Sequence, residues 1–116
     1  MTQSRIDVFT AMAREQPEDA MIWYGLASEY VKLEMWSEAA AALRHVVRLN
    51  PDYTAAYQML GTALWNQGES GEARRAWTDG IETATRTGAW KARQHMEGLL
   101  ANASADSGTG FCGEER

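Results

Sequence analysis

The stretch that decides the fold is residues 17–51, PEDAMIWYGLASEYVKLEMWSEAAAALRHVVRLNP, which begins and ends with the two prolines of the chain. Pro17 and Pro51 stand 34 residues apart, and the residues after Pro51 repeat the pattern of large and small side chains that follows Pro17. The matching pairs are Trp23 with Tyr57, Leu26 with Leu60, Ala27 with Gly61, Tyr30 with Leu64, Ala39 with Ala73, and Leu43 with Trp77. Self-similarity at such a period predicts stacked repeats, which make surfaces, rather than a closed catalytic domain.

Apolar residues recur at helical spacing along the chain, as in Trp23, Leu26, Ala27 and Tyr30. This periodicity predicts helices over residues 4–16, 18–33, 38–49, 53–67, 71–84 and 88–102. We therefore expect an all-α fold, an antiparallel helix-turn-helix solenoid of about six helices. Two full units, about 18–51 and 52–85, lie between the flanking helices 4–16 and 88–102.

The chain is short enough to form one domain, which we expect to cover residues 1–103. The last segment, SADSGTGFCGEER at residues 104–116, is rich in glycine, serine and acidic residues. It has no apolar stripe that could pack on a core, so we predict a disordered tail.

The charge balance excludes several classes of partner. Sixteen acidic and 11 basic side chains among 116 residues give a formal net charge of −5. A nucleic-acid binder needs a basic surface, so we expect no nucleic-acid partner.

The N-terminus lacks the apolar core of a signal peptide, and no apolar run is long enough to span a bilayer. A cytoplasmic protein without membrane insertion is the expectation.

The two units resemble the tetratricopeptide repeat family, whose unit is a helix-turn-helix of about 34 residues. The first unit carries the family pattern at Trp23, Leu26, Ala27, Tyr30, Ala39, Leu43, Val46 and Pro51. The second unit carries it at Tyr57, Leu60, Gly61, Leu64, Ala73, Trp77 and Gly80. Two departures stand out: Glu34 replaces the glycine that Gly68 supplies in the second unit, and Thr85 stands where a second closing proline is expected.

In this family the first helix of each unit lines a concave groove, so the resemblance implies a groove here. The positions that helical rotation leaves outside the core face are called the predicted groove residues. They are Met21, Tyr24, Ser28, Val31 and Lys32 in the first unit, and Ala55, Gln58, Thr62, Trp65 and Asn66 in the second. Tyr24 and Trp65 are large aromatic residues, as interface hot spots often are. Either they anchor a bound peptide, or the first helix or the last helix, through Trp90, covers them.

Some tetratricopeptide repeats grip chaperone C-terminal tails with a carboxylate clamp of lysine and asparagine. The matching positions here hold Tyr24, Ser28 and Met59, so the clamp is absent. Function as a co-chaperone of that kind is therefore not expected.

No constellation of residues predicts catalysis or a cofactor. His45 and His95 have no second ligand at metal-binding spacing and no nucleophile beside them, and Cys112 is the only cysteine. The carboxylates of Asp19, Glu29, Glu38 and Glu72 are assigned to helix starts and solvated faces. The sequence therefore favours a non-catalytic adaptor that binds a peptide or helix. Self-association of two chains as a scaffold stays open as the alternative.

Overall fold

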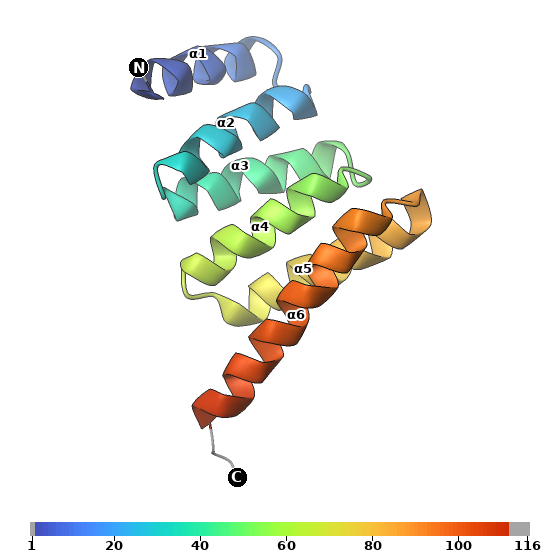
Figure 1. Ribbon diagram of the computed structural model, residues 1–116. Helices are drawn as coiled ribbons and strands as arrows, with labels where there is room; N and C mark the ends of the chain where they lie inside the picture. Colours follow the sequence, from blue (N-terminus) through green and yellow to red (C-terminus); the bar gives the residue numbers. More distant parts are fainter. Residues whose placement is uncertain (1, 112–116) are drawn as a thin grey trace.

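The computed structural model describes the backbone of residues 2–111 and the side chains of residues 5–103. Within that part of the chain, the regular structure consists of the helices α1 (Thr2–Glu15), α2 (Ala20–Lys32), α3 (Trp36–Leu49), α4 (Thr54–Asn66), α5 (Ser70–Thr87) and α6 (Trp90–Phe111). Each helix packs on the next, from α1 at one end of the array to α6 at the other (Figure 1). The radius of gyration of 15.2 Å exceeds the roughly 13 Å of a compact domain of this length. The predicted all-α solenoid is confirmed.

The two units use the same hydrogen bonds one repeat apart. Trp23 Nε1 donates to the carbonyl oxygen of Pro17 over 2.9 Å, and the hydroxyl of Tyr57 donates to the carbonyl oxygen of Pro51 over 3.1 Å. The aromatic residue of each first helix therefore fixes the proline turn that precedes it. This bond explains why an aromatic residue follows each proline at the same spacing.

The turn inside each unit places one residue in the left-handed conformation. That residue is Glu34 (φ 58°) in the first unit and Gly68 (φ 92°) in the second. The next amide closes each turn: Met35 N donates to Tyr30 O over 2.9 Å, and Glu69 N to Leu64 O over 2.8 Å. Glycine adopts this conformation without steric cost, whereas glutamate does not. Glu34, which departs from the family pattern, therefore adopts this conformation at the cost of backbone strain in the turn.

The core lies between the paired helices α2–α3 and α4–α5 and continues to α6. Small residues stand where helices approach closely: Ala27 and Gly61 are buried, and Trp77 lies against Gly61. Leu43 and Val46 of α3 are fully buried between the units. Burial of each such side chain contributes about 1.5–3 kcal/mol to the free energy of unfolding, so this apolar core supplies most of the stability of the fold.

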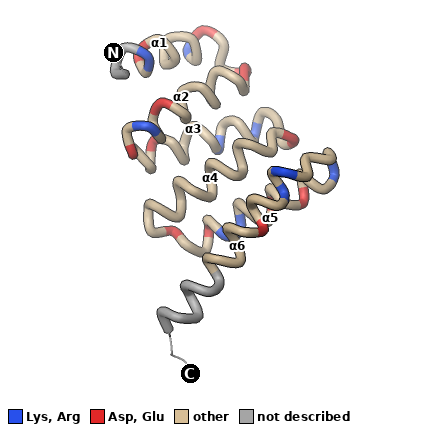
Figure 2. The backbone as a smooth tube through the Cα atoms, in the orientation of Figure 1, with Lys and Arg blue, Asp and Glu red and all other residues tan. Residues whose placement is uncertain are grey.

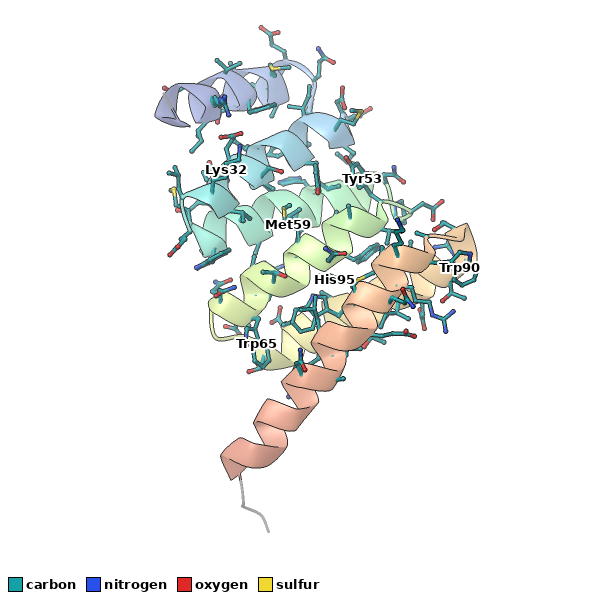
Figure 3. All side chains as sticks on the ribbon, viewed as in Figure 1. Lys32, Tyr53, Met59, Trp65, Trp90 and His95 are labelled. Atoms are coloured by element: carbon teal, nitrogen blue, oxygen red, sulfur yellow. The ribbon has the colours of Figure 1, made fainter. Side chains whose placement is uncertain are left out.

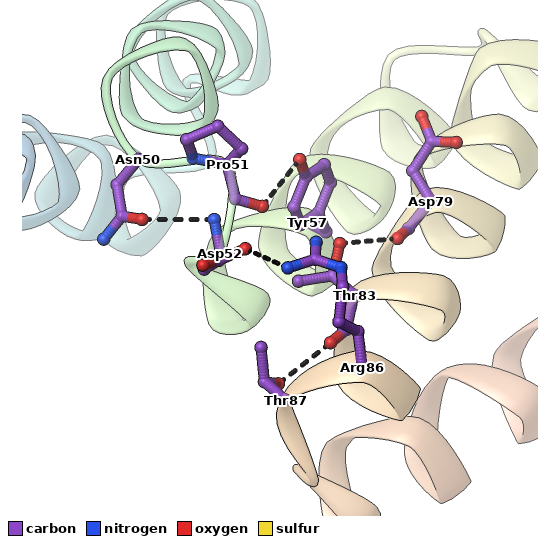
Figure 4. A network of polar contacts seen from close by, with 8 residues as sticks. All are labelled: Asn50, Pro51, Asp52, Tyr57, Asp79, Thr83, Arg86 and Thr87. Carbon is purple, nitrogen blue, oxygen red and sulfur yellow. Dashed lines mark hydrogen bonds and ion pairs between the residues drawn. The ribbon is translucent and has the colours of Figure 1, made fainter.

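Helix α5 is longer than predicted because Thr85 does not stop it. α3 ends at Leu49, before Pro51, whereas α5 continues to Thr87 and ends at Gly88 (φ 81°). The extra turn brings Arg86 to Asp52 in the turn before α4, where the two side chains form an ion pair over 2.5 Å (Figure 4). The pair links the end of α5 to the turn between the two units.

Helix α6 also differs from the prediction. It begins at Trp90 rather than at residue 88, because α5 ends later, and it continues to Phe111. Residues 104–111, which we expected to belong to a disordered tail, are therefore helical, while residues 112–116 lie outside the described residues. Ala103 is buried against the core, so packing holds α6 past the predicted end at residue 102. No proline follows to end the helix.

Candidate functional site

The first helices of the units, α2 and α4, together with α6 form one face of the array, which we call the inner face (Figure 3). Helix α4 lies in the middle of this face and has no charged residue in its 13 residues. Figure 2 shows it as an uncharged band between the charged ends of the array. The inner face therefore presents a neutral, partly apolar surface at its centre.

A small pocket opens between α4, α5 and α6, and we call it the α4–α6 pocket. Its volume is about 130 Å³, and it is lined by Thr62, Trp65, Trp77, Leu99, Asn102 and Ala103. The indole rings of Trp65 and Trp77 lie 6.0 Å apart at a tilt of 34° and form one wall. Pockets that hold a drug-sized ligand measure about 300–1,000 Å³, so this one suits a single apolar side chain rather than a cofactor.

Two tyrosines stack where the first unit meets the second. The ring centroids of Tyr24 on α2 and Tyr53, which precedes α4, lie 5.0 Å apart at an angle of 24°. Burial, and the neighbouring Tyr53, raise the pKa of the Tyr24 hydroxyl above its ordinary value. Tyr24 is therefore half-buried in a ring pair and does not project freely from the face.

A wider depression of about 670 Å³ lies near the start of α2, at the turns before α2 and α4. Met21, with 72% of its surface exposed, and Tyr53 supply its apolar contacts. Its remaining lining residues are Glu15, Gln16, Pro17, Glu18, Asp19, Ala20 and Asn50. Three of these are carboxylates and none is basic, so the depression has a negative potential. Asp19 also accepts a hydrogen bond from Met21 N over 3.0 Å, as expected of a helix cap.

The polar groove residues mostly bond to their own helices. The hydroxyl of Ser28 donates to Tyr24 O, that of Thr62 to Gln58 O, and the amide of Asn66 to Thr62 O. These bonds satisfy the side-chain donors locally and leave acceptor capacity on the hydroxyl oxygens. Val31 and Trp65 are half-buried and pack against the core.

Lys32, the only charged side chain among the predicted groove residues, forms an ion pair. Its ammonium lies 3.3 Å from Oε2 of Glu29, and Arg5 of α1 approaches the same oxygen at 3.7 Å. The assignment of Glu29 to a solvated face was wrong, because only 5% of this residue is exposed. Helix α1 covers this face of α2, which the helical pattern of α2 alone could not reveal.

The sequence left open whether the last helix covers Trp65, and it does so in part. Helix α6 covers one side of the ring, but through the region of Leu99 and Ala103. Trp90 does not take part, because it is 58% exposed at the other end of α6, where the guanidinium of Arg93 lies 5.6 Å from its ring centroid. Trp65 thus remains half-buried at an open pocket.

The structure brings together Thr62 and Trp65 from the predicted set, and it adds three residues that sequence reasoning missed. These are Tyr53, Leu99 and Asn102. Tyr53 precedes its helix, so helical rotation could not place it. Leu99 lies on the last helix, and only the crossing of α6 over α4 shows that it lines a pocket. Whether the predicted groove residues bind a partner stays a prediction.

His45 lies between an aromatic and a basic neighbour. His45 stacks on Trp23 with ring centroids 4.2 Å apart and shares a 2.7 Å hydrogen bond with Arg48. Burial, and the charge of Arg48, lower the pKa of His45. Among the described residues, no three His, Cys, Asp or Glu side chains gather as a metal site would require. In the same part of the chain, no helix is long and apolar enough to cross a membrane.

Comparisons with known proteins agree with this architecture. The family model described as tetratricopeptide repeat matches residues 20–63. A TPR repeat-containing protein of Pseudomonas aeruginosa is 30% identical over 95 residues, which is 82% of this chain and 90% of the relative. This chain therefore belongs to the tetratricopeptide repeat family.

Solved structures share the fold over almost the whole chain. A solution structure of a Bordetella parapertussis protein matches with a TM-score of 0.80 at 22% identity, covering 96% of both chains. The TPR2B domain of yeast Sti1, solved in a complex with an Hsp70 peptide, matches with a TM-score of 0.80 at 22% identity. That match covers 87% of this chain and 81% of the domain. At these identities the likeness shows the fold alone.

Proposed function

We propose that this protein is a non-catalytic adaptor that binds a short segment of a partner protein along its inner face. The observation that carries the proposal is the uncharged helix α4, flanked by an apolar pocket at one end and a negatively charged depression at the other. Interface cores are depleted in charge and enriched in aromatic residues, as this face is.

The α4–α6 pocket supports an anchor of one apolar side chain. Trp65 and Leu99 supply apolar walls, while Thr62 and Asn102 supply polar groups. Binding energy in interfaces concentrates in apolar pockets that lose their water when the partner fills them. Filling it would remove apolar surface of both partners from water.

The depression near Met21 supports a positively charged residue at the other end of the bound segment. Glu15, Glu18 and Asp19 face it without a basic neighbour in its lining. Along α4, the 12 steps from Tyr53 to Trp65 span about 18 Å at 1.5 Å per residue. An extended peptide covers that distance in about five or six residues. We therefore expect an apolar and a basic residue at that separation, and roughly micromolar affinity because the contact area is small.

Structural neighbours that bind chaperone peptides support the proposal that a face of this fold binds a peptide. They do not support the same ligand for this chain. The yeast Sti1 domains were solved with Hsp70 and Hsp90 peptides. The positions where the clamp of such members has lysine and asparagine hold Tyr24, Ser28 and Met59 here. An acidic C-terminal tail would also meet the carboxylates of the depression. We therefore propose a partner segment of neutral or positive charge.

A random-peptide display selection followed by titration tests this proposal. Selected peptides should share an apolar residue and a basic residue about five or six positions apart. Asn102→Trp should weaken their binding about tenfold or more, because an indole would fill the pocket without removing core atoms. The matched control is Thr78→Trp, at an exposed position of α5, which should bind as the wild type does.

Two results would contradict the proposal. One is a set of selected peptides that binds Asn102→Trp as tightly as the wild-type protein. The other is the absence of any selected peptide at affinities tighter than about millimolar, which would exclude recognition of a short linear segment.

A further inference from the structure

Helix α1 has an apolar stripe on the side that turns away from the array. Its inner side packs on α2 through Ile6 and Ala13, which are buried. On the opposite side, Val8 is 58% exposed and Met12 38% exposed, with exposed Ala11 between them. These three residues recur at helical spacing and form a second stripe. As α1 lies at the end of the array (Figure 1), no described helix covers that stripe.

Two charged residues flank this stripe along one edge. Asp7 and Arg14 are exposed and stand seven residues apart, so they share one side of the helix at a separation of about 10.5 Å. That separation is too large for an ion pair between them. Within the described side chains, neither forms an ion pair or hydrogen bond with another residue.

We propose that α1 pairs with α1 of a second copy of this chain, in an antiparallel arrangement about a two-fold axis near Thr10 and Ala11. A two-fold axis makes each contact occur twice, with residue i of one copy against residue j of the other and the reverse. With the axis perpendicular to the helices, Asp7 meets Arg14 of the second copy, and Arg14 meets Asp7 of the second copy. Val8 then lies against Ala11 and Met12 of the second copy.

The charge pattern fixes the direction of this pairing. A parallel pair, with the two-fold axis along the helices, would put Asp7 and Arg14 of the two copies on opposite edges of the interface, so these two residues could not pair across it. The antiparallel pair makes two opposite-charge contacts and also aligns the helix dipoles favourably. Ala11, nearest the axis, is small enough to let the two helices approach closely.

The dimer leaves the inner face open in both copies, because its contacts lie on the outer side of the first helix. It is therefore compatible with peptide binding but independent of it. One pair of 14-residue helices buries less than the roughly 1,200 Å² of a standard stable interface. We expect a weak dimer, with a dissociation constant of about 100 µM.

Charge reversal in the intact chain tests the pairing. Sedimentation velocity of the wild-type protein up to about 1 mM should show a reversible monomer–dimer equilibrium. Asp7→Arg and Arg14→Asp should each weaken it about tenfold, because each replaces two attractive contacts by two repulsive ones. An equimolar mixture of the two variants should form a heterodimer, since every contact across the axis is then between opposite charges. Arg75→Asp, at an exposed site on α5, is the matched control and should dimerise normally.

Recovery of association in the mixture, but not in either variant alone, supports the proposal. Mixing the two variants can restore a charge contact only if that contact runs between two chains. Circular dichroism should show equal helix content in all variants. A wild-type protein that stays monomeric at 1 mM overturns the proposal. So does a dimer whose strength Asp7→Arg and Arg14→Asp both leave unchanged, because another surface would then hold the copies together.

Discussion

Replacing Gly61 by leucine is expected to lower the free energy of unfolding by about 3 kcal/mol, the upper part of the range for overpacked cores. A Cβ atom at Gly61 would stand only 2.1 Å from Nε1 of Trp77. That indole is 3% exposed, so it has little room to move. Its Nε1 also donates to Gln58 O over 3.2 Å, and displacement would break this bond between α5 and α4. A branched side chain therefore wedges the second helix pair apart.

Urea denaturation followed by circular dichroism measures this effect. The matched control is Gly98→Leu on α6, because a Cβ atom there would meet no atom within 4 Å. Helix propensity should make that variant neutral or slightly more stable. An unchanged unfolding midpoint in Gly61→Leu would show that the pairing of α4 with α5 is not as described.

Replacing Met96 by alanine is expected to cost about 2–5 kcal/mol, the range for truncation of a buried long side chain. Met96 is fully buried and is one of the largest such side chains among residues 5–103. It fills the space above Gly80, where a Cβ atom would stand 2.4 Å from the methionine sulfur. The truncation leaves a cavity under α6, the helix that carries Leu99 and Asn102 of the α4–α6 pocket. Loss of stability and loss of the pocket should therefore occur together.

Thermal and urea unfolding of Met96→Ala, with hydrogen exchange of α6 amides, measures both consequences. Met21→Ala, at an exposed position, should stay within about 0.5 kcal/mol of the wild type. A loss in Met96→Ala no larger than that of Met21→Ala would contradict the docking of α6 on the second unit.

The sequence predicted the parts of the fold that depend on repetition. The spacing of Pro17 and Pro51 gave the unit, and the aromatic residues Trp23 and Tyr57 bond to the carbonyls of those prolines as a repeat requires. The sequence shows that Thr85 stands where a closing proline is expected, but it does not show that α5 continues to Thr87. Where a helix stops without a proline depends on the neighbours that the extra turn meets, here Asp52 with Arg86.

The candidate site was harder to predict, for a physical reason. Helical periodicity tells which face of one helix is apolar, but not which helix crosses that face. Glu29 was therefore assigned to a solvated face, because its own helix does not show that α1 covers it. For Tyr24, the sequence left open whether it anchors a peptide or is covered by a helix, and it did not predict the stacking on Tyr53. The α4–α6 pocket depends on the angle at which α6 crosses α4, and that angle is set by packing rather than by a local pattern.

The measurement that tests the central claim most directly is an amide NMR titration of the protein with a selected peptide. The account predicts that shifts concentrate on the inner face, at Thr62 and Trp65 of α4, Leu99 and Asn102 of α6, and Met21 at the start of α2. Amides of the outer residues Arg44 and Arg75 should stay unchanged. Shifts that concentrate instead on α3 and α5, around Arg44 and Arg75, would contradict the account, because the binding surface would then be the opposite face of the array.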